Sequence, residues 1–62
     1  MENGIRTLLE SFPTNYPVDN VIVNGEFVQT TNFINIEGDL AFFRNNNQTR
    51  IFRIESIDGL DF

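Results

Sequence analysis

The chain has 62 residues with nine acidic side chains, four arginines, no histidine and no cysteine, and its formal net charge is −5 at pH 7. This length allows one domain, residues 1–62, and the absence of cysteine and histidine excludes disulfides and the common zinc sites. The charge opposes general binding to nucleic-acid backbones and anionic membranes, and no apolar run approaches the roughly 20 residues of a membrane span. The N-terminus lacks a secretory signal pattern, so we expect a cytoplasmic protein.

The first apolar residues recur with the period of an α-helix. They fall at i, i+3, i+4 and i+7, which places them on one helix face: Ile5, Leu8, Leu9 and Phe12. Asn3 is a suitable N-cap, and Pro13 disfavours helical geometry in the residue before it, so we expect a helix over about residues 3–12. A helix this short does not persist alone in water. It must therefore dock on the sheet of its own chain or of a neighbour.

Asn24-Gly25 is the strongest turn signal in the chain. It lies between the apolar runs Val21-Ile22-Val23 and Phe27-Val28, and a two-residue hairpin needs central residues that tolerate positive φ, as Asn and Gly do. The dipeptide therefore predicts an antiparallel β architecture. The first strand is expected at about Val18–Val23.

The segment after this hairpin, residues 26–36, is long for a single strand. Its apolar positions change from odd-numbered, as at Phe33, to even-numbered, as at Ile34 and Ile36. A strand keeps one face inward only if this parity is preserved. We therefore expect a bulge or sharp bend near residues 31–33, the feature by which small barrels turn a strand from one sheet into the next.

Three more strands are expected, over about residues 40–44, 48–54 and 57–60. The sequences between the strands are typical of turns: Glu37-Gly38-Asp39, Asn45-Asn46-Asn47, and Glu55-Ser56, the last as a single tight helical turn. The fold class is therefore mainly β: an N-terminal helix followed by a five-stranded antiparallel small barrel over about residues 18–62. Adjacent Phe42 and Phe43 indicate that at least one aromatic ring points away from the main interior.

This order of elements resembles the Sm-like barrels, most nearly the bacterial Hfq type. The residues that carry the resemblance are Ile22-Val23-Asn24-Gly25, Phe33 to Phe43, and Ile51-Phe52-Arg53 leading to Ile57. The resemblance implies rings in which the fourth strand pairs with the fifth strand of a neighbour, and single-stranded RNA bound around the pore. Phe52-Arg53-Ile54 falls where that family has Tyr-Lys-His. A Src-homology-3-like barrel without ring assembly would show the same pattern.

The apolar inventory favours self-association. Leu, Ile, Val and Phe number 22 and Ala occurs once, which is more bulky surface than a small interior readily hides. The candidate oligomer contacts are Phe43, Ile51, Ile57 and Leu60. The alternative is that a compact barrel with its docked helix absorbs all of them.

Arginines near the third hairpin form the one basic region of the chain. With neighbouring phenylalanines they offer the mixture of cations and aromatic rings that single-stranded nucleic acid binds, and the candidate RNA contacts are Arg44, Arg50, Phe52 and Arg53. Arg50 and Arg53 have opposite parity and should point to opposite faces. This parity and the net negative charge argue against nucleic acid as the partner.

No catalytic constellation is visible, and we expect no enzyme, no cofactor and no metal. The serine and threonine hydroxyls have no histidine to activate them. Two carboxylate pairs, Glu37 with Asp39 and Asp58 with Asp61, supply too few oxygens for calcium and are interpreted as solvated turns. The leading hypothesis is a non-enzymatic, oligomeric interaction or regulatory protein. The alternatives are an Sm-like ring that binds single-stranded RNA and an acidic nucleic-acid mimic that inhibits a DNA-binding enzyme.

Overall fold

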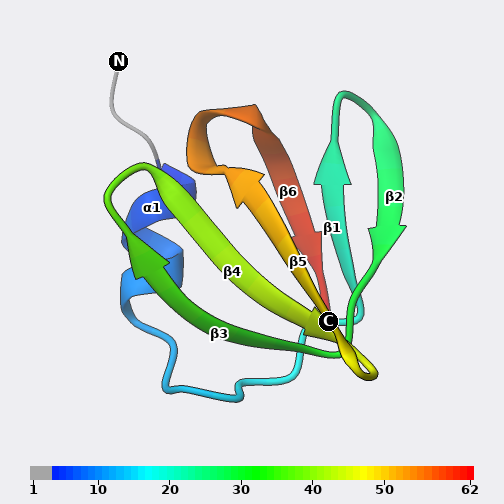
Figure 1. Ribbon diagram of the computed structural model, residues 1–62. Coiled ribbons are helices and arrows are strands. Elements are labelled where there is room, and N and C mark those ends of the chain that lie inside the picture. The colour runs from blue at the N-terminus through cyan, green and yellow to red at the C-terminus, as the bar shows by residue number, and fades with distance from the viewer. Residues whose placement is uncertain (1–3) are drawn as a thin grey trace.

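The computed structural model describes residues 4–62, and Figure 1 shows a short helix beside two small sheets. The elements in chain order are α1 (Gly4–Glu10), β1 (Asn20–Val23), β2 (Glu26–Gln29), β3 (Asn32–Glu37), β4 (Leu40–Asn45), β5 (Gln48–Arg53), the 3-10 turn η1 (Ile54–Ser56) and β6 (Ile57–Asp61). All named strand pairs are antiparallel, and the strand orders are β2-β1-β6 and β3-β4-β5. The prediction of a mainly β chain with an N-terminal helix is confirmed.

The hairpin turns contain residues at positive φ. Both central residues of the β1–β2 turn have it, Asn24 at 54° and Gly25 at 80°, and this backbone type matches the twist of the flanking strands. Gly38 begins the β3–β4 turn at 60°, and Asn46 begins the β4–β5 turn at 57°. The hairpin predicted from Asn24-Gly25 is therefore confirmed.

The long segment after the first hairpin forms two strands that belong to different sheets. At the bend between β2 and β3, Thr30 is buried and its Oγ1 donates a hydrogen bond to the Val18 carbonyl oxygen at 2.7 Å. A register shift between Phe33 and Asn35 then lets both Phe33 and Ile36 pack on the core. The predicted break in this segment is confirmed, but it divides the segment, so the described residues hold six strands where five were expected.

The predicted closed barrel is not observed. β5 is the last strand of one sheet and β6 is an edge of the other, and within residues 4–62 the two are not paired. The predicted tight helical turn between them, η1, explains why. At its start the Ile54 N–H donates to the Asp39 carbonyl oxygen at 2.9 Å, which completes the pairing of β5 with β4, and the chain then turns toward β1. The two sheets therefore leave open edges at β5 and β6.

Both sheets contribute side chains to one core. Its buried members are Leu9, Val18, Val21, Phe33, Ala41, Phe43, Ile54 and Ile57. The Phe43 ring lies edge-on to the rings of Phe33 and Phe52, with centroids 5.5 and 5.6 Å apart. The radius of gyration is 10.3 Å, and a compact chain of this length has about 10.5 Å. The described chain thus packs as one unit around these rings.

The helix covers part of the core. α1 is shorter than the predicted range of about 3–12, and the predicted N-cap Asn3 lies outside the described residues. Leu9 is fully buried and Phe12, just beyond the helix, is half-buried against the core, whereas Leu8 is 39% exposed. The helix docks on its own chain, where it contacts β3, β6 and η1. Among the described residues, no helix has the length and apolar character needed to cross a bilayer.

Candidate functional site

The outer face of the β3-β4-β5 sheet presents apolar and charged side chains together. Ala41 and Phe43 on β4 are buried, so Phe42 between them points outward. Phe42 is paired in register with Ile51 on β5, and the neighbouring pairs on the same face join Leu40 to Arg53 and Arg44 to Thr49. We call these residues the outer patch: Leu40, Phe42, Arg44, Thr49, Ile51 and Arg53.

Two apolar members of the outer patch are open to solvent, Ile51 (54% exposed) and Leu40 (37%), and Phe42 is half-buried. Arg53 Nη2 lies 3.0 Å from Glu55 Oε2, and both side chains are 67% exposed, so this ion pair contributes little to stability. Arg44 forms no ion pair within residues 4–62. The patch therefore has solvated cations around an apolar centre, a surface suited to contacts with another molecule.

The four candidate RNA contacts do not share one face. Arg44 and Arg53 belong to the outer patch, whereas Phe52 packs its ring into the core and Arg50 lies on that inner side at the sheet edge. The register of β4 with β5 therefore places Arg50 and Arg53 on opposite faces of the sheet, as predicted. The aromatic ring that accompanies Arg44 and Arg53 is Phe42, which was not among the candidates. The sequence feature that pointed to an outward ring was the adjacent pair Phe42-Phe43.

Two of the four candidate oligomer contacts lie in the core. Phe43 is fully buried on the inner face of the central strand, and Ile57 is 5% exposed at the start of β6. Neither side chain offers surface to a neighbouring copy, because the two sheets pack over both. Leu60 is half-buried against the core, and Ile51 remains open to solvent. Of the four, Ile51 is thus the side chain that a second molecule can reach most fully.

β5 also leaves one side of its backbone open, because it is the edge of its sheet. The Ile54 N–H donates to the Asp39 carbonyl oxygen, so Asp39 and Ile54 form a hydrogen-bonded pair. The two kinds of pair alternate along an antiparallel ladder, so the next pair, Leu40 with Arg53, is not hydrogen-bonded. By alternation, Thr49, Ile51 and Arg53 turn their N–H and C=O groups away from β4. The strand has no proline and no bulge, and the charged side chains that it carries are Arg50 and Arg53. We call this side of the strand the β5 edge.

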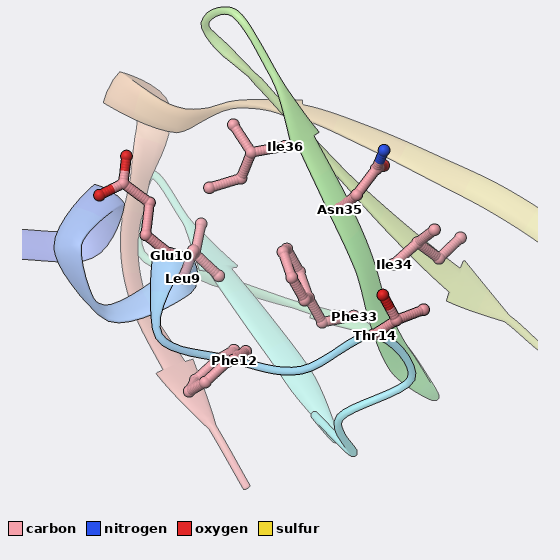
Figure 2. Close-up of a pocket in the computed structure, with 8 residues that line it drawn as sticks. All are labelled: Leu9, Glu10, Phe12, Thr14, Phe33, Ile34, Asn35 and Ile36. Atoms are coloured by element: carbon pink, nitrogen blue, oxygen red, sulfur yellow. The ribbon is translucent and has the colours of Figure 1, made fainter.

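A hollow lies between α1 and β3 (Figure 2). Its volume is about 210 Å³, which is below the size of typical drug or cofactor sites. Figure 2 shows Phe33 and Ile36 pointing from β3 toward Leu9 on α1. Glu10, Phe12 and Thr14 complete the side of the hollow formed by α1 and the segment that follows it, and Ile34 and Asn35 complete the side formed by β3. The hollow is therefore mainly apolar, with one carboxylate at its rim.

The carboxylates of the described chain do not form a metal-ion cage. No group of three or more His, Cys, Asp or Glu side chains gathers within residues 4–62. Asp39 lies 3.2 Å from Arg6 Nη2, and Asp58 Oδ2 accepts a hydrogen bond from the Gly25 N–H at 3.0 Å. These two aspartates therefore act in contacts between segments, and Asp58 braces the β1–β2 turn.

Comparison of the chain with protein-family models, with curated proteins and with solved structures gave no match.

Proposed function

We propose that the protein is a non-enzymatic interaction protein that works as an oligomer, assembled by pairing the β5 edge of one copy with β6 of the next. The observation that carries the proposal is the open β5 edge, which presents three residues' backbone groups together with the exposed Ile51 side chain. Such an edge pairs readily with another strand unless it is protected. This arrangement corresponds to the ring that the Sm-like resemblance implies.

Charge supports β6 as the partner strand. β5 carries Arg50 and Arg53 and no acidic residue, whereas β6 carries Asp58 and Asp61 and no basic residue. Both aspartates accept hydrogen bonds within the chain, Asp58 from the Gly25 N–H and Asp61 from Asn20 Nδ2. Opposite charges on neighbouring strands favour the pairing of β5 with β6. Pairing of β5 with the β5 strand of another copy is disfavoured, because it would bring arginines close to one another.

Small size supports a need for a partner. A chain of this length buries only about 60% of the surface that it exposes when unfolded, and proteins of this class commonly gain stability from disulfides, metals or further subunits. This chain has no cysteine, and large apolar side chains such as Phe27 (64%) and Ile51 (54%) stay exposed. Association would cover part of this surface.

Sedimentation velocity at rising protein concentration tests the proposal. We expect a shift from about 7 kDa to a multiple of that mass, and a lower mass again at high salt, because screening weakens the arginine–aspartate attraction. A species that stays monomeric at every concentration and salt would contradict the proposal.

A pair of variants at one position identifies the edge. Ile51→Pro removes an N–H that points away from β4, so it breaks no hydrogen bond within the sheet, and proline is tolerated on such an edge. Ile51→Thr removes the same exposed apolar side chain but keeps the N–H. We expect monomers from the proline variant and oligomers from the threonine variant. Equal association of the two would exclude the β5 edge as the contact.

RNA binding is the second candidate function, because Arg44, Arg53 and the outward Phe42 share the outer patch. A base could stack on the ring while the guanidinium groups contact phosphates. Fluorescence anisotropy with A-rich and U-rich oligonucleotides tests this function. Affinity that falls with salt and is reduced by Arg44→Gln would support it, and an unchanged anisotropy would reject it.

A further inference from the structure

The hollow between α1 and β3 is bounded by hydrogen bonds at both of its ends. At one end Arg6 Nη2 donates to the Gly38 carbonyl oxygen at 3.1 Å and to Asp39 Oδ1 at 3.2 Å, which ties the helix to the β3–β4 turn. At the other end the backbones of Asn15 and Tyr16 exchange hydrogen bonds with Phe33, each at 2.8 Å. Between these contacts Leu9 on α1 and Phe33 on β3 are buried and form the floor of the hollow. The hollow is therefore an open depression whose two ends are tied by hydrogen bonds.

The size and lining of the hollow suit one large apolar side chain. Its volume is about 210 Å³, and it is open to solvent on one side. Leu9 and Phe33 form its buried floor, and the half-buried Phe12 and Ile36 are the apolar side chains that a guest can reach. A leucine or phenylalanine side chain of a partner would fill this space without displacing any hydrogen bond of the chain.

The strand beside the hollow also offers backbone groups. Leu40 does not form backbone hydrogen bonds with Arg53 on β5, so its N–H and C=O groups point toward β3, where Leu40 pairs with Glu37. The next residue of β3, Ile36, therefore turns its N–H and C=O groups away from β4. The segment around Tyr16 pairs with the beginning of β3 and then leaves for the helix. The edge at Ile36 is thus free for an extended guest chain, the mode of recognition in which backbone bonds give affinity and alternate side chains give specificity.

The charge at the rim of the hollow indicates the charge of the peptide that would bind there. Glu10 lies at the rim, at the end of α1, and among the described residues it has no ion-pair or hydrogen-bond partner. The nearest arginine along the helix, Arg6, is turned to the β3–β4 turn. Glu10 lies in the final turn of α1, so its carboxylate and the negative end of the helix dipole both favour a cation at this part of the rim.

We infer that the hollow between α1 and β3 is a docking site for an extended peptide segment of a partner protein, in which a large apolar residue enters the hollow and an adjacent lysine or arginine faces Glu10. This site is separate from the β5 edge, so an assembled ring would carry one such site on every copy.

Three capped tetrapeptides test the inference by titration of the isotope-labelled full chain in heteronuclear NMR. They are acetyl-Thr-Leu-Arg-Thr-amide, the same peptide with Glu in place of Arg, and the same peptide with Ala in place of Leu. We expect the first to shift the amide signals of Leu9, Thr14 and Ile36. The Glu peptide should bind about two- to fivefold more weakly, as expected for one exposed ion pair. The Ala peptide should bind at least about tenfold more weakly, because it leaves the hollow empty.

Variants separate the apolar and the charged contributions. Thr14→Leu fills the hollow from its rim and should abolish the shifts at Ile36. Glu10→Gln should remove the preference for Arg over Glu, and Glu26→Gln on β2, a matched exposed carboxylate outside the hollow, should leave that preference unchanged. Well-dispersed spectra of each variant show that the fold is kept. Equal affinity for all three peptides, or shifts scattered away from the hollow, would overturn the inference whatever the oligomeric state.

Discussion

Replacing Phe43 tests the assignment of the core more directly than any other substitution. Its side chain is fully buried, and its ring contacts those of Phe33 and Phe52 edge-on at 5.5 and 5.6 Å. Removing such a ring costs about 3–5 kcal/mol, since transfer energy is lost and a cavity remains. A chain of 62 residues has an unfolding free energy of roughly 3–9 kcal/mol. We therefore expect Phe43→Ala to lose a large share of the unfolding free energy of the chain, and to unfold at 25 °C if that free energy lies at the lower end of this range.

Phe43→Leu keeps the test quantitative if the alanine variant does not fold. Leucine retains part of the volume but loses both ring contacts, so we expect a loss of about 1–2 kcal/mol. With a urea m-value of about 1 kcal/mol/M for a domain this small, the unfolding midpoint should fall by about 1–2 M. Urea titration followed by far-UV circular dichroism, at one fixed protein concentration, measures the shift.

Phe27→Ala is the matched control, because Phe27 is 64% exposed on β2. A surface position of this kind changes stability by about 0.5 kcal/mol or less. If Phe27→Ala lowered the midpoint as much as Phe43→Leu does, the packing of Phe43 between the two sheets would be refuted.

Three further substitutions probe single features of the fold by urea or thermal unfolding. Leu9→Ala should cost about 2–3 kcal/mol and reduce the helical signal at 222 nm, because Leu9 is fully buried and a helix this short needs its docking contact; an unchanged signal would show that α1 does not depend on the core. Gly25→Ala should cost about 1 kcal/mol, since Gly25 has φ of 80°, and no loss would contradict the turn geometry. Thr30→Val should cost about 1–3 kcal/mol, because the Val18 carbonyl loses the hydroxyl that donates to it at 2.7 Å, and a stabilised variant would contradict that bond.

Short-range sequence patterns predicted most of the strands and turns of this protein. Asn24-Gly25 predicted its hairpin, because few residues other than Asn and Gly adopt positive φ at low cost. The loss of parity between Phe33 and Ile36 predicted a break in the long strand, and the structure places a bend and a register shift there. These features depend on neighbours a few residues apart, so they can be read before any tertiary contact is known.

The candidate sites depended on contacts that local patterns do not encode. The adjacency of Phe42 and Phe43 showed that one ring points outward, but the pairing of β4 with β3 and β5 decided that it is Phe42, which then joins Arg44 and Arg53. Periodicity assigns a residue to one of two faces and carries no information on which face becomes the core.

Tertiary structure alone also decided that the sheets stay open and that a hollow forms. Both follow from where distant segments meet: η1 sends β6 to pair with β1 instead of closing on β5, and the helix end meets β3 more than twenty residues later in the chain. The hollow between α1 and β3 results from how closely the helix and the strand approach one another. Because that distance is set by the packing of the whole core, the sequence determined the parts of this protein, and the tertiary structure decided which surfaces remain free to bind.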